Sequence, residues 1–281
     1  MSVTPDARMR SAGDHRIFIG TSGYSFADWV GPFYPPGMKP GEFLAYYARH
    51  FEVVEVNASY YRIPDASMFE RMVRKTPDGF RFVVKLNQAM THARSLDPAL
   101  YREFLAALAP LKDAGRYDGL LAQFPWGFKR TVEHRRHLVG MRERLAGEPL
   151  FVEFRHDSWL TPGLEPSLRE HRIGYCAVDE PPLPGLMPPI TLVTTEDAYV
   201  RFHGRNAATW WGRSGEEGAA TGDRYDYDYR EDELREWVRK VATLAEQARR
   251  TYLFFNNCHA GQAARNAKLM QELLRQQNLP A

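Results

Sequence analysis

The chain has 281 residues, of which 44% are hydrophobic and 26% are charged, so its composition excludes a disordered or fibrous protein. Lysine and arginine number 37 against 35 acidic residues, and this net charge of +2 is too small for a protein whose main task is to coat nucleic acid or an anionic membrane. No apolar run approaches the roughly 18 residues of a membrane span. Cys176 and Cys258 lie far apart and form no metal-binding pair, which is typical of a cytoplasmic protein.

The segment at the start of the chain has no apolar stretch and predicts a flexible tail over residues 1–15, ahead of a single domain over residues 16–281. Eight short apolar runs follow, rich in β-branched and aromatic residues and flanked by Gly, Pro, Asn or Asp, as is typical of strands. These runs cover residues 17–21, 52–57, 80–87, 119–124, 150–155, 173–178, 199–204 and 252–257.

Stretches with helical spacing of apolar residues lie between many of these runs, and Asp97 and Pro98 predict the start of one helix. Repeated strand-then-helix units predict a parallel sheet covered by helices, and eight units in a chain of this length predict a (β/α)8 TIM-type barrel. Residues 179–196 contain too many prolines for a full helix, so we expect no helix between strands six and seven. The rival, a doubly wound open sheet, usually has a Gly-rich phosphate loop that residues 20–23 do not match.

Alternation along the strands predicts where polar side chains point, because the face toward the helices must be apolar. In residues 150–155, Val152 and Phe154 face the helices, which turns Glu153 and Arg155 inward. The same rule predicts an inward position for Glu55, Asn57, Lys85, Asn87, Gln123, Asp179, Arg201 and His203. These residues lie at the C-terminal ends of the strands, where barrel enzymes have their active sites. The alternative is a self-neutralising network that only fills the barrel, and burial makes this costly.

Seven stretches of the sequence, taken together, resemble the YecE-like family, domain of unknown function 72, whose members are TIM-type barrels. They are GTSGYSFADWVGPFYP (20–35), VEVNASYYRIP (54–64), FVVKLNQAMTH (82–92), AQFP (122–125), VEFRHDSW (152–159), YVRFHGR (199–205) and FFNNCHAGQAARNA (254–267). The resemblance implies the barrel fold over nearly the whole chain. It implies no reaction, because the family is uncharacterised and its association with sugar isomerases is an analogy of fold.

The motif residues of this family coincide largely with the inward set. They also include Ser22, Trp29, Tyr61, Thr91, His92, His156, Trp159, Asn256 and Asn257. The densest cluster is Glu153, Arg155 and His156, in which a carboxylate beside a guanidinium fork suits an anionic substrate. The alternative is an ion pair that braces the strand. His203 is either a proton carrier near neutral pH or a structural histidine.

Lys85 could form a Schiff base with a carbonyl substrate, or it could pair with Glu55 from the adjacent strand. We expect the ion pair, because lysine nucleophiles are rarer than ion pairs. Residue types that a divalent metal uses are also present, but three cationic side chains share the same interior and would repel the ion. These candidate ligands are Glu55, Glu153, Asp179 and His203. His92, His156, His203 and His259 leave a zinc site possible, although their spacing is not diagnostic. We therefore expect no metal and no other cofactor.

Aromatic residues are also expected at the mouth of the barrel, where they could stack on sugar rings or unpaired bases. They are Tyr24, Trp29, Tyr60, Tyr61, Trp126, Trp159, Trp210 and Trp211. Residues 212–224 are rich in Gly and charged residues and predict a mobile loop after strand seven.

The first hypothesis is a barrel enzyme, of isomerase, lyase or hydrolase type, that acts by acid/base chemistry on a small polar, anionic, carbohydrate-like molecule. The catalytic candidates are Glu153, His203, Glu55 and Lys85. The substrate-binding candidates are Arg155, His156, Arg201, Asn57, Gln123, Tyr61, His92, Trp159, Asn256, Asn257 and Ser22. One alternative is nucleic-acid binding or metal-assisted phosphodiester cleavage, suggested by 30 arginines and the rim aromatics. Another is a non-catalytic ligand-binding or interaction protein. We expect no membrane partner, and the oligomeric state is left open.

Overall fold

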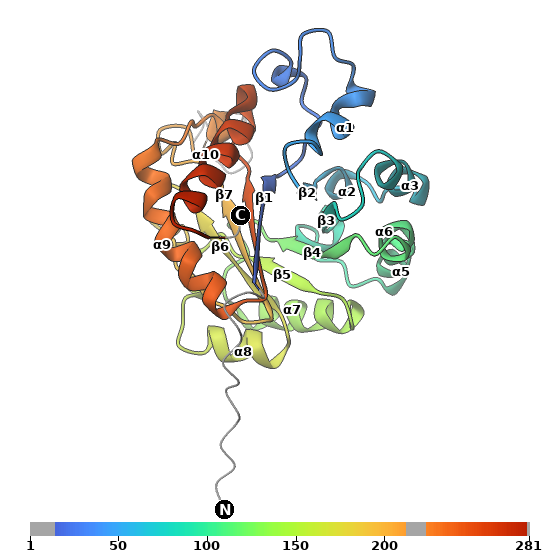
Figure 1. Ribbon diagram of the computed structural model, residues 1–281. Coiled ribbons are helices and arrows are strands. Elements are labelled where there is room, and N and C mark those ends of the chain that lie inside the picture. Colours follow the sequence, from blue (N-terminus) through green and yellow to red (C-terminus); the bar gives the residue numbers. More distant parts are fainter. Residues whose placement is uncertain (1–14, 212–222, 280–281) are drawn as a thin grey trace, which may run out of the picture.

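The computed structural model describes residues 15–211 and 223–279, which form the predicted TIM-type barrel (Figure 1). Its eight strands are β1 (Arg16–Thr21), β2 (Val53–Val56), β3 (Arg81–Lys85), β4 (Tyr117–Gln123), β5 (Leu150–Glu153), β6 (Gly174–Asp179), β7 (Asp197–Phe202) and β8 (Arg250–Phe255). The predicted strand bounds differ from these by at most two residues. The predicted tail lies outside the described residues except for its last residue, and so do residues 212–222 of the predicted mobile loop.

Every neighbouring pair of strands is parallel, and the order around the sheet is β1-β8-β7-β6-β5-β4-β3-β2. Between β1 and β2 an isolated bridge joins Ser22 to Glu55. Beside it, the hydroxyl of Tyr47 accepts a hydrogen bond from the Thr21 N–H (2.9 Å) and donates one to the Val53 carbonyl (3.0 Å). A single tyrosine side chain therefore links the backbones of the two strands that meet at this seam.

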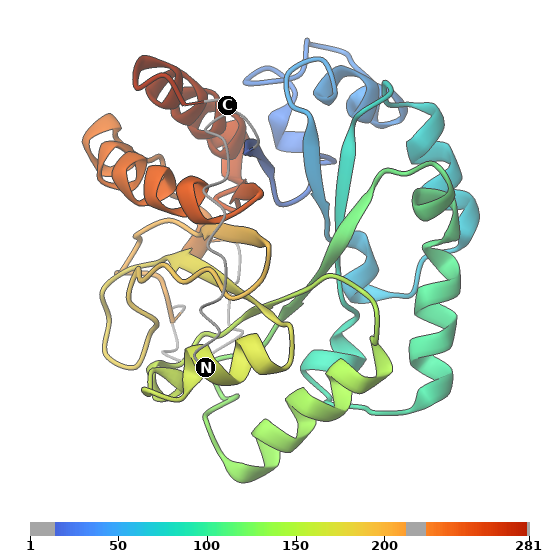
Figure 2. The ribbon, with the colours of Figure 1, turned by 60° about the horizontal axis from the view of Figure 1, so that its bottom comes forward.

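Helices cover the outside of the sheet (Figure 2). They are α1 (Phe43–Tyr47), α2 (Ala58–Tyr61), α3 (Ala66–Arg74), α4 (Gln88–Thr91), α5 (Pro98–Ala107), α6 (Ala109–Asp113), α7 (Val132–Arg144), α8 (Leu164–Glu170), α9 (Glu231–Gln247) and α10 (Gln262–Gln276). The side chain of Asp97 caps α5 as predicted, by accepting a hydrogen bond from the Ala99 N–H at 2.9 Å. Residues 180–196, all described, contain no helix, which confirms the predicted irregularity. None of the helices in the described part of the chain is long and apolar enough to cross a membrane.

Two apolar cores separate the faces of the strands as the alternation predicts. The larger core lies between the sheet and the helices and contains Val152 and Phe154. The smaller core fills the barrel interior, and Phe151 belongs to it. Its other members are Phe18, Val53, Val83, Leu121, Cys176, Tyr199, Tyr252 and Phe254. Because these side chains fill the interior, the inward polar residues are confined to the C-terminal ends of the strands.

The inward prediction for Asp179 is wrong. Its carboxylate faces α9, where it accepts hydrogen bonds from the Tyr229 hydroxyl (2.7 Å), from the Trp237 indole N–H and from Arg205 (2.7 Å). The physical reason is the alternation itself, because Asp179 shares the face of β6 that carries Tyr175. Asp179 therefore anchors a helix to the barrel and takes no part in its interior.

Candidate active site

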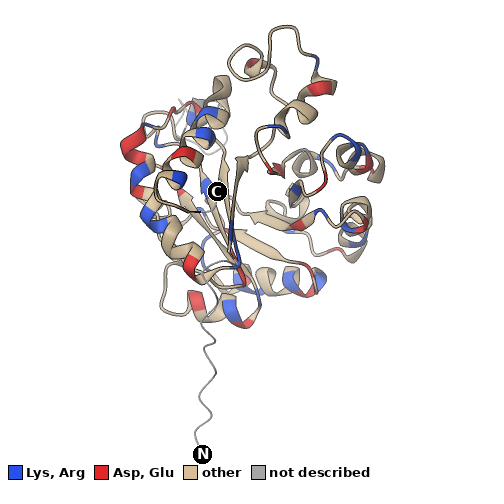
Figure 3. Cartoon of the chain, viewed as in Figure 1, with Lys and Arg blue, Asp and Glu red and all other residues tan. Residues whose placement is uncertain are grey.

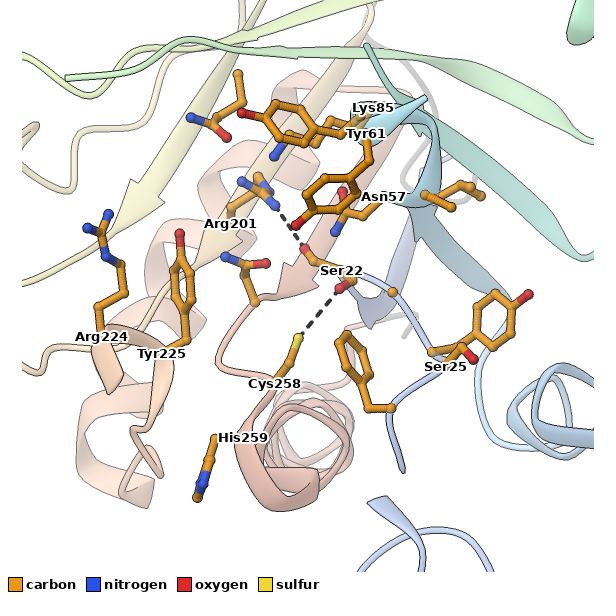
Figure 4. A pocket seen from close by; sticks show the side chains of 18 of the residues that line it. Ser22, Ser25, Asn57, Tyr61, Lys85, Arg201, Arg224, Tyr225, Cys258 and His259 are labelled. Carbon is orange, nitrogen blue, oxygen red and sulfur yellow. Dashed lines mark hydrogen bonds between the residues drawn. The ribbon is translucent and has the colours of Figure 1, made fainter. Parts of the chain in front are cut away.

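A cavity of about 1040 Å3 lies at the C-terminal ends of the strands (Figure 4). Nine predicted site residues line it: Ser22, Asn57, Tyr61, Lys85, His92, Gln123, Arg155, Arg201 and Asn256. Six of the predicted rim aromatics line it too: Tyr24, Tyr60, Tyr61, Trp126, Trp210 and Trp211. Trp29 and Trp159, the other two, are buried in the core. The inward polar residues and the rim aromatics therefore meet in one hollow.

Arg201 is the centre of the cavity floor and bridges two buried glutamates. Its Nη2 lies 2.8 Å from Glu55 Oε1, and its Nη1 lies 2.7 Å from Glu153 Oε2. The Tyr199 hydroxyl donates a further hydrogen bond to Glu55 Oε2 at 2.7 Å. Both glutamates are fully buried, so their charges depend on these partners. Arg201 Nη2 also donates to Ser22 Oγ at 3.2 Å (Figure 4), while its Nε has no hydrogen-bond partner among the described residues.

Arg155 extends the same network toward β6. Its Nε donates to Glu153 Oε1, and its Nη1 lies 3.2 Å from Glu180 Oε2. Glu180 also accepts a hydrogen bond from the Met187 N–H at 3.0 Å. Burial raises the pKa of Glu180 to about 8, and the nearby Arg155 only partly offsets this effect. Glu180 is therefore a carboxyl group that can hold its proton near neutral pH.

The pKa of Glu153 is shifted in the opposite direction from that of Glu180. Burial opposes its ionisation, but Arg155, Arg201 and His203 together hold the pKa of Glu153 well below its usual range. Its carboxylate stays ionised between the two guanidinium groups and does not line the cavity. This geometry suits a fixed counter-charge better than a group that exchanges protons with a ligand.

His203 is buried beside Glu153 and is held neutral. Its Nδ1 lies 3.0 Å from Asn256 Nδ2 and 3.4 Å from Arg155 Nη2. A guanidinium group can only donate, so Nδ1 accepts and the ring proton belongs on Nε2, which lies 3.3 Å from Glu153 Oε1. Burial and the charge of Arg155 lower the pKa of His203 to about 3. The imidazole therefore orients its neighbours in its neutral form.

Lys85 projects into the cavity from the end of β3 (Figure 4). Its Nζ lies over the ring of Tyr60, 4.4 Å from the centroid. The predicted ion pair with Glu55 is wrong: among the described residues no carboxylate lies within 4.0 Å of the Lys85 amine, because Glu55 is bound to Arg201 and Tyr199. Burial and the nearby Arg201 lower the pKa of Lys85 to about 7.

Arg224 and Tyr225 form another wall of the cavity, from the short turn that follows the undescribed segment 212–222 (Figure 4). Arg224 is only 8% exposed, and its Nε and Nη2 have no hydrogen-bond partner in the described structure. It lies over the rings of Trp210 (5.7 Å) and Tyr225 (5.9 Å), and the guanidinium group of Arg155 also lies over Trp210 (5.9 Å). Buried, unpaired guanidinium donors are ready to bind an anion.

The charges that line the cavity are unbalanced. Four cationic side chains reach it, Lys85, Arg155, Arg201 and Arg224, and Asp28 is the one acidic residue among the described lining residues. No group of three or more His, Cys, Asp or Glu side chains in the described part of the chain is arranged to hold a metal ion. The chemistry of this wall therefore favours an anion.

The comparisons with known proteins place this chain in a family. Residues 18–281 match the family described as "Protein of unknown function DUF72". The chain belongs to the DUF72 family. It is 33% identical to the UPF0759 protein YunF of Bacillus subtilis over 92% of this chain and 94% of that protein. It is 32% identical to the UPF0759 protein YecE of Escherichia coli K12 over 53% of this chain and 52% of that protein. The crystal structure of a DUF72 family protein (TM1631) from Thermotoga maritima superimposes with a TM-score of 0.85 at 40% identity, covering 93% of this chain and all of that one.

Six predicted site residues of this DUF72 protein do not line the cavity. Glu55, Glu153 and His203 lie beneath it, in contact with the arginines, and the other three lie elsewhere. Trp159 stacks on Phe154 (4.1 Å between centroids) and donates to the Phe128 carbonyl, so it is a core residue. Asn257 is fully buried and donates to Asn266 Oδ1 at 2.7 Å. His156 accepts a hydrogen bond from the Ser158 N–H at 3.0 Å and caps a short turn.

Sequence reasoning missed other residues of the site: Asp28, Glu180, Tyr199, Arg224, Tyr225, Cys258 and His259. A signal existed for two of them. Tyr199 has the same parity as Arg201, and Glu180 follows Cys176 and the interior face of β6 by an even number of positions. Arg224 and Tyr225 follow a Gly-rich segment without periodicity, so nothing in the sequence indicated their place.

Proposed function

We propose that this cavity binds a small polar anion of carbohydrate type and carries out acid/base chemistry on it, as an isomerase or lyase would. The observation that carries the proposal is the excess of cationic side chains on the wall, with the unpaired donors of Arg224 and Arg201. Hydrogen bonds from charged donors to an anion are the strong ones. A phosphate or carboxylate group of the ligand would supply the acceptors that these nitrogen atoms lack.

The residues then divide into distinct roles. Arg201, Arg224 and Arg155 hold the anionic group, and Asn57, Gln123 and Asn256 bind hydroxyl groups. The rim aromatics offer flat apolar faces for the ring of a sugar.

Lys85 is the proton carrier in this proposal, because its pKa of about 7 lets it hold or release a proton near neutral pH and because it lines the cavity. Glu55, Glu153 and His203 are positioning residues, because they contact the arginines from beneath the cavity. The roles of Glu153 and His203 therefore differ from the proton-carrier roles expected from the sequence.

We favour a small anion over nucleic acid because of the outer surface. Figure 3 shows lysine and arginine interspersed with aspartate and glutamate along the outer helices α9 and α10. A protein that holds a nucleic-acid backbone presents a continuous basic track. Two exposed arginines on these helices are paired with acids, Arg235 with Glu231 and Arg265 with Asp228.

The test is a binding screen with phosphorylated sugars and sugar acids, each beside its uncharged parent sugar, read by thermal shift and then by calorimetry. We expect the anionic compounds to bind and the parent sugars to fail. Arg224→Met should weaken binding at least about tenfold, because a hydrogen bond to a charged group contributes ~1.5–3 kcal/mol. Arg169→Met is the matched control, since Arg169 pairs with Glu165 on the surface of α8. Equal binding of the uncharged sugars, or no binding at all, contradicts the proposal.

A second experiment distinguishes an enzyme from a protein that only binds a ligand. Lys85→Arg keeps a positive charge in the cavity but cannot release a proton near neutral pH. We expect this variant to retain ligand binding and to lose turnover of any compound that the wild-type protein converts. A protein that binds ligand but converts none of the compounds that bind supports the non-catalytic alternative.

A further inference from the structure

The backbone of Lys85 is held in place, while its amine has no counter-ion among the described residues. Its carbonyl oxygen accepts a hydrogen bond from Ser59 Oγ at 2.6 Å, and the same hydroxyl oxygen lies 3.1 Å from the Val56 carbonyl oxygen of the neighbouring strand. The Lys85 Nζ, by contrast, lies over the Tyr60 ring and has no carboxylate within 4.0 Å in the described parts of the chain. The side chain is thus anchored at its base, while its amine faces the cavity.

The carboxylates that could neutralise this amine are bound elsewhere. Glu55 contacts Arg201 and Tyr199, and Glu153 contacts Arg201 and Arg155. Of the nearby charges, the guanidinium group of Arg201 therefore acts most strongly on Lys85, and it repels the protonated amine. A desolvated lysine beside another cation is the arrangement that activates an amine as a nucleophile.

We propose that Lys85 is a carbonyl-reactive amine, which forms a covalent imine with an aldehyde or ketone that carries a phosphate or carboxylate group. This inference rests on the proposed function, because the arginines must bind the anionic group before the carbonyl group reaches the amine. It narrows the ligand class from a polar anion to an anionic carbonyl compound, which includes the open-chain forms of phosphorylated sugars.

The reaction balances without any further reagent. The lone pair of Lys85 Nζ attacks the carbonyl carbon, and the carbonyl oxygen takes up a proton as the amine loses one, giving a carbinolamine. A second proton on that oxygen lets it leave as water, and the remaining C=N bond is a protonated imine. Hydrolysis reverses each step. Borohydride, added from outside, reduces the imine to a stable secondary amine and so records where it formed.

The charge state of Lys85 supports this chemistry near neutral pH. A pKa of about 7, against the usual ~10.4, leaves roughly a thousand times more free amine at pH 7 than an ordinary lysine has. The chain offers a matched comparison in Lys240 of α9. Its Nζ also lies over an aromatic ring, 4.5 Å from the Trp237 centroid, and burial lowers its pKa, but it lies outside the cavity.

The experiment uses pyridoxal 5′-phosphate as a probe, because it joins an aldehyde to a phosphate and its imine absorbs visible light. The full-length protein is treated at pH 7, reduced with borohydride, digested, and its labelled lysines are mapped by mass spectrometry. Pyridoxine 5′-phosphate, which has an alcohol in place of the aldehyde, measures anion binding alone by calorimetry. The same comparison is then made with a smaller aldehyde, glyceraldehyde 3-phosphate, and its matching alcohol, glycerol 3-phosphate.

We expect label on Lys85 to exceed label on Lys240 at least tenfold and to fall when the alcohol competitor is added. Arg224→Met should lower the label on Lys85 and leave Lys240 unchanged. Lys85→Arg should remove that label while the variant still binds the alcohol, which also shows that the variant is folded.

Two outcomes would overturn the inference, and they differ. If an alcohol probe binds in an Arg224-dependent way while Lys85 is labelled no faster than Lys240 by the matching aldehyde, the imine is excluded and the anion site stands. If neither alcohol binds, nor any anion of the sugar screen, the proposed function fails and the imine fails with it.

Discussion

At the N-terminal ends of the strands, Arg81 and Arg250 use all their side-chain nitrogen atoms in hydrogen bonds. Asp118 accepts from Arg81 and from Arg250 (2.8 Å), and Asp197 accepts from Arg250 (2.6 Å). At the C-terminal ends the same residue types form a network in which one nitrogen atom of Arg201 has no partner among the residues that the structure describes. At the N-terminal ends of the strands every side-chain nitrogen of Arg81 and Arg250 therefore has a partner, whereas at the C-terminal ends one arginine nitrogen has none among the described residues.

This contrast teaches how to recognise a site among buried charges. A count of ionisable groups does not distinguish the two ends, since both contain arginines between carboxylates. Among the described residues, the buried guanidinium nitrogen atoms without a hydrogen-bond partner belong to Arg201 and Arg224, and both side chains line the cavity. Hydroxyl groups without a partner also occur at the other end, on Thr251 and Tyr252. Buried charged donors normally have partners, so a guanidinium nitrogen that lacks one beside a cavity indicates a ligand.

The largest effect is expected from Glu153→Gln, which removes the negative charge between Arg155 and Arg201. Two guanidinium groups then share a buried site with one counter-charge fewer, and we expect a loss of about 3–5 kcal/mol in the free energy of unfolding. Urea denaturation measures it. The wild-type contribution should disappear in acid, because a lowered pKa gives stability above the unfolded value of ~4.3 that is lost as the pH falls through the folded value.

Glu165→Gln is the control for this change. Glu165 forms an exposed pair with Arg169 one helical turn away, and such pairs contribute ~0.3–0.5 kcal/mol. A Glu153→Gln protein as stable as this control would mean that the floor of the cavity does not depend on its ion pairs.

A smaller effect is expected at the opposite end from Asp118→Asn. The guanidinium groups of Arg81 and Arg250 are partly exposed there, so water can replace part of the lost interaction. We expect a loss of about 2 kcal/mol in the free energy of unfolding and an unchanged affinity for any anion that binds the cavity. Weaker ligand binding in this variant would break the division between a structural end and a binding end.

The smallest effect, when it is measured over one pH unit near neutrality, is a slope of stability with pH that belongs to Glu180. Its folded pKa of about 8 exceeds the unfolded value of ~4.3, so between these values the folded state holds more protons than the unfolded state. Its contribution is present below the unfolded value and is lost as the pH rises toward 8. We expect wild-type stability to fall relative to Glu180→Gln by up to ~1.4 kcal/mol per pH unit across this range. Parallel pH profiles of the two proteins would rule this assignment out.

The fold could be predicted from the sequence because alternation is a strong constraint on a barrel. Val152 and Phe154 must be covered by helices, which leaves Glu153 no direction except the interior. The error at Asp179 arose at a strand end, where Asp179 and Glu180 stand side by side and only the parity of the strand tells them apart. Glu180 is the one that contacts Arg155.

The candidate site could be predicted only in part, for two physical reasons. Asn257 and Trp159 are in motifs that the family shares, but a motif does not distinguish a residue that binds a ligand from one that supports the wall. Arg224 and Tyr225 reach the cavity from a turn, and turns have no periodicity that would fix the direction of a side chain. The pairing of Glu55 with Arg201 instead of Lys85 depends on distances across the barrel, which the sequence does not contain.

The seam between β1 and β2 has a consequence for the breadth of ligands that the barrel can admit. Gly20 lies so close to β2 that a Cβ atom there would be 2.3 Å from the Val53 carbonyl oxygen, yet the strands are joined beside it by the hydroxyl of Tyr47. The Tyr47 hydroxyl and the isolated bridge between Ser22 and Glu55 join these two strands, while seven ladders join the other neighbouring pairs. The wall between Ser22 and Asn57 therefore has fewer strand-to-strand bonds than the rest of the barrel, and we expect the mouth to widen there first for a bulkier ligand.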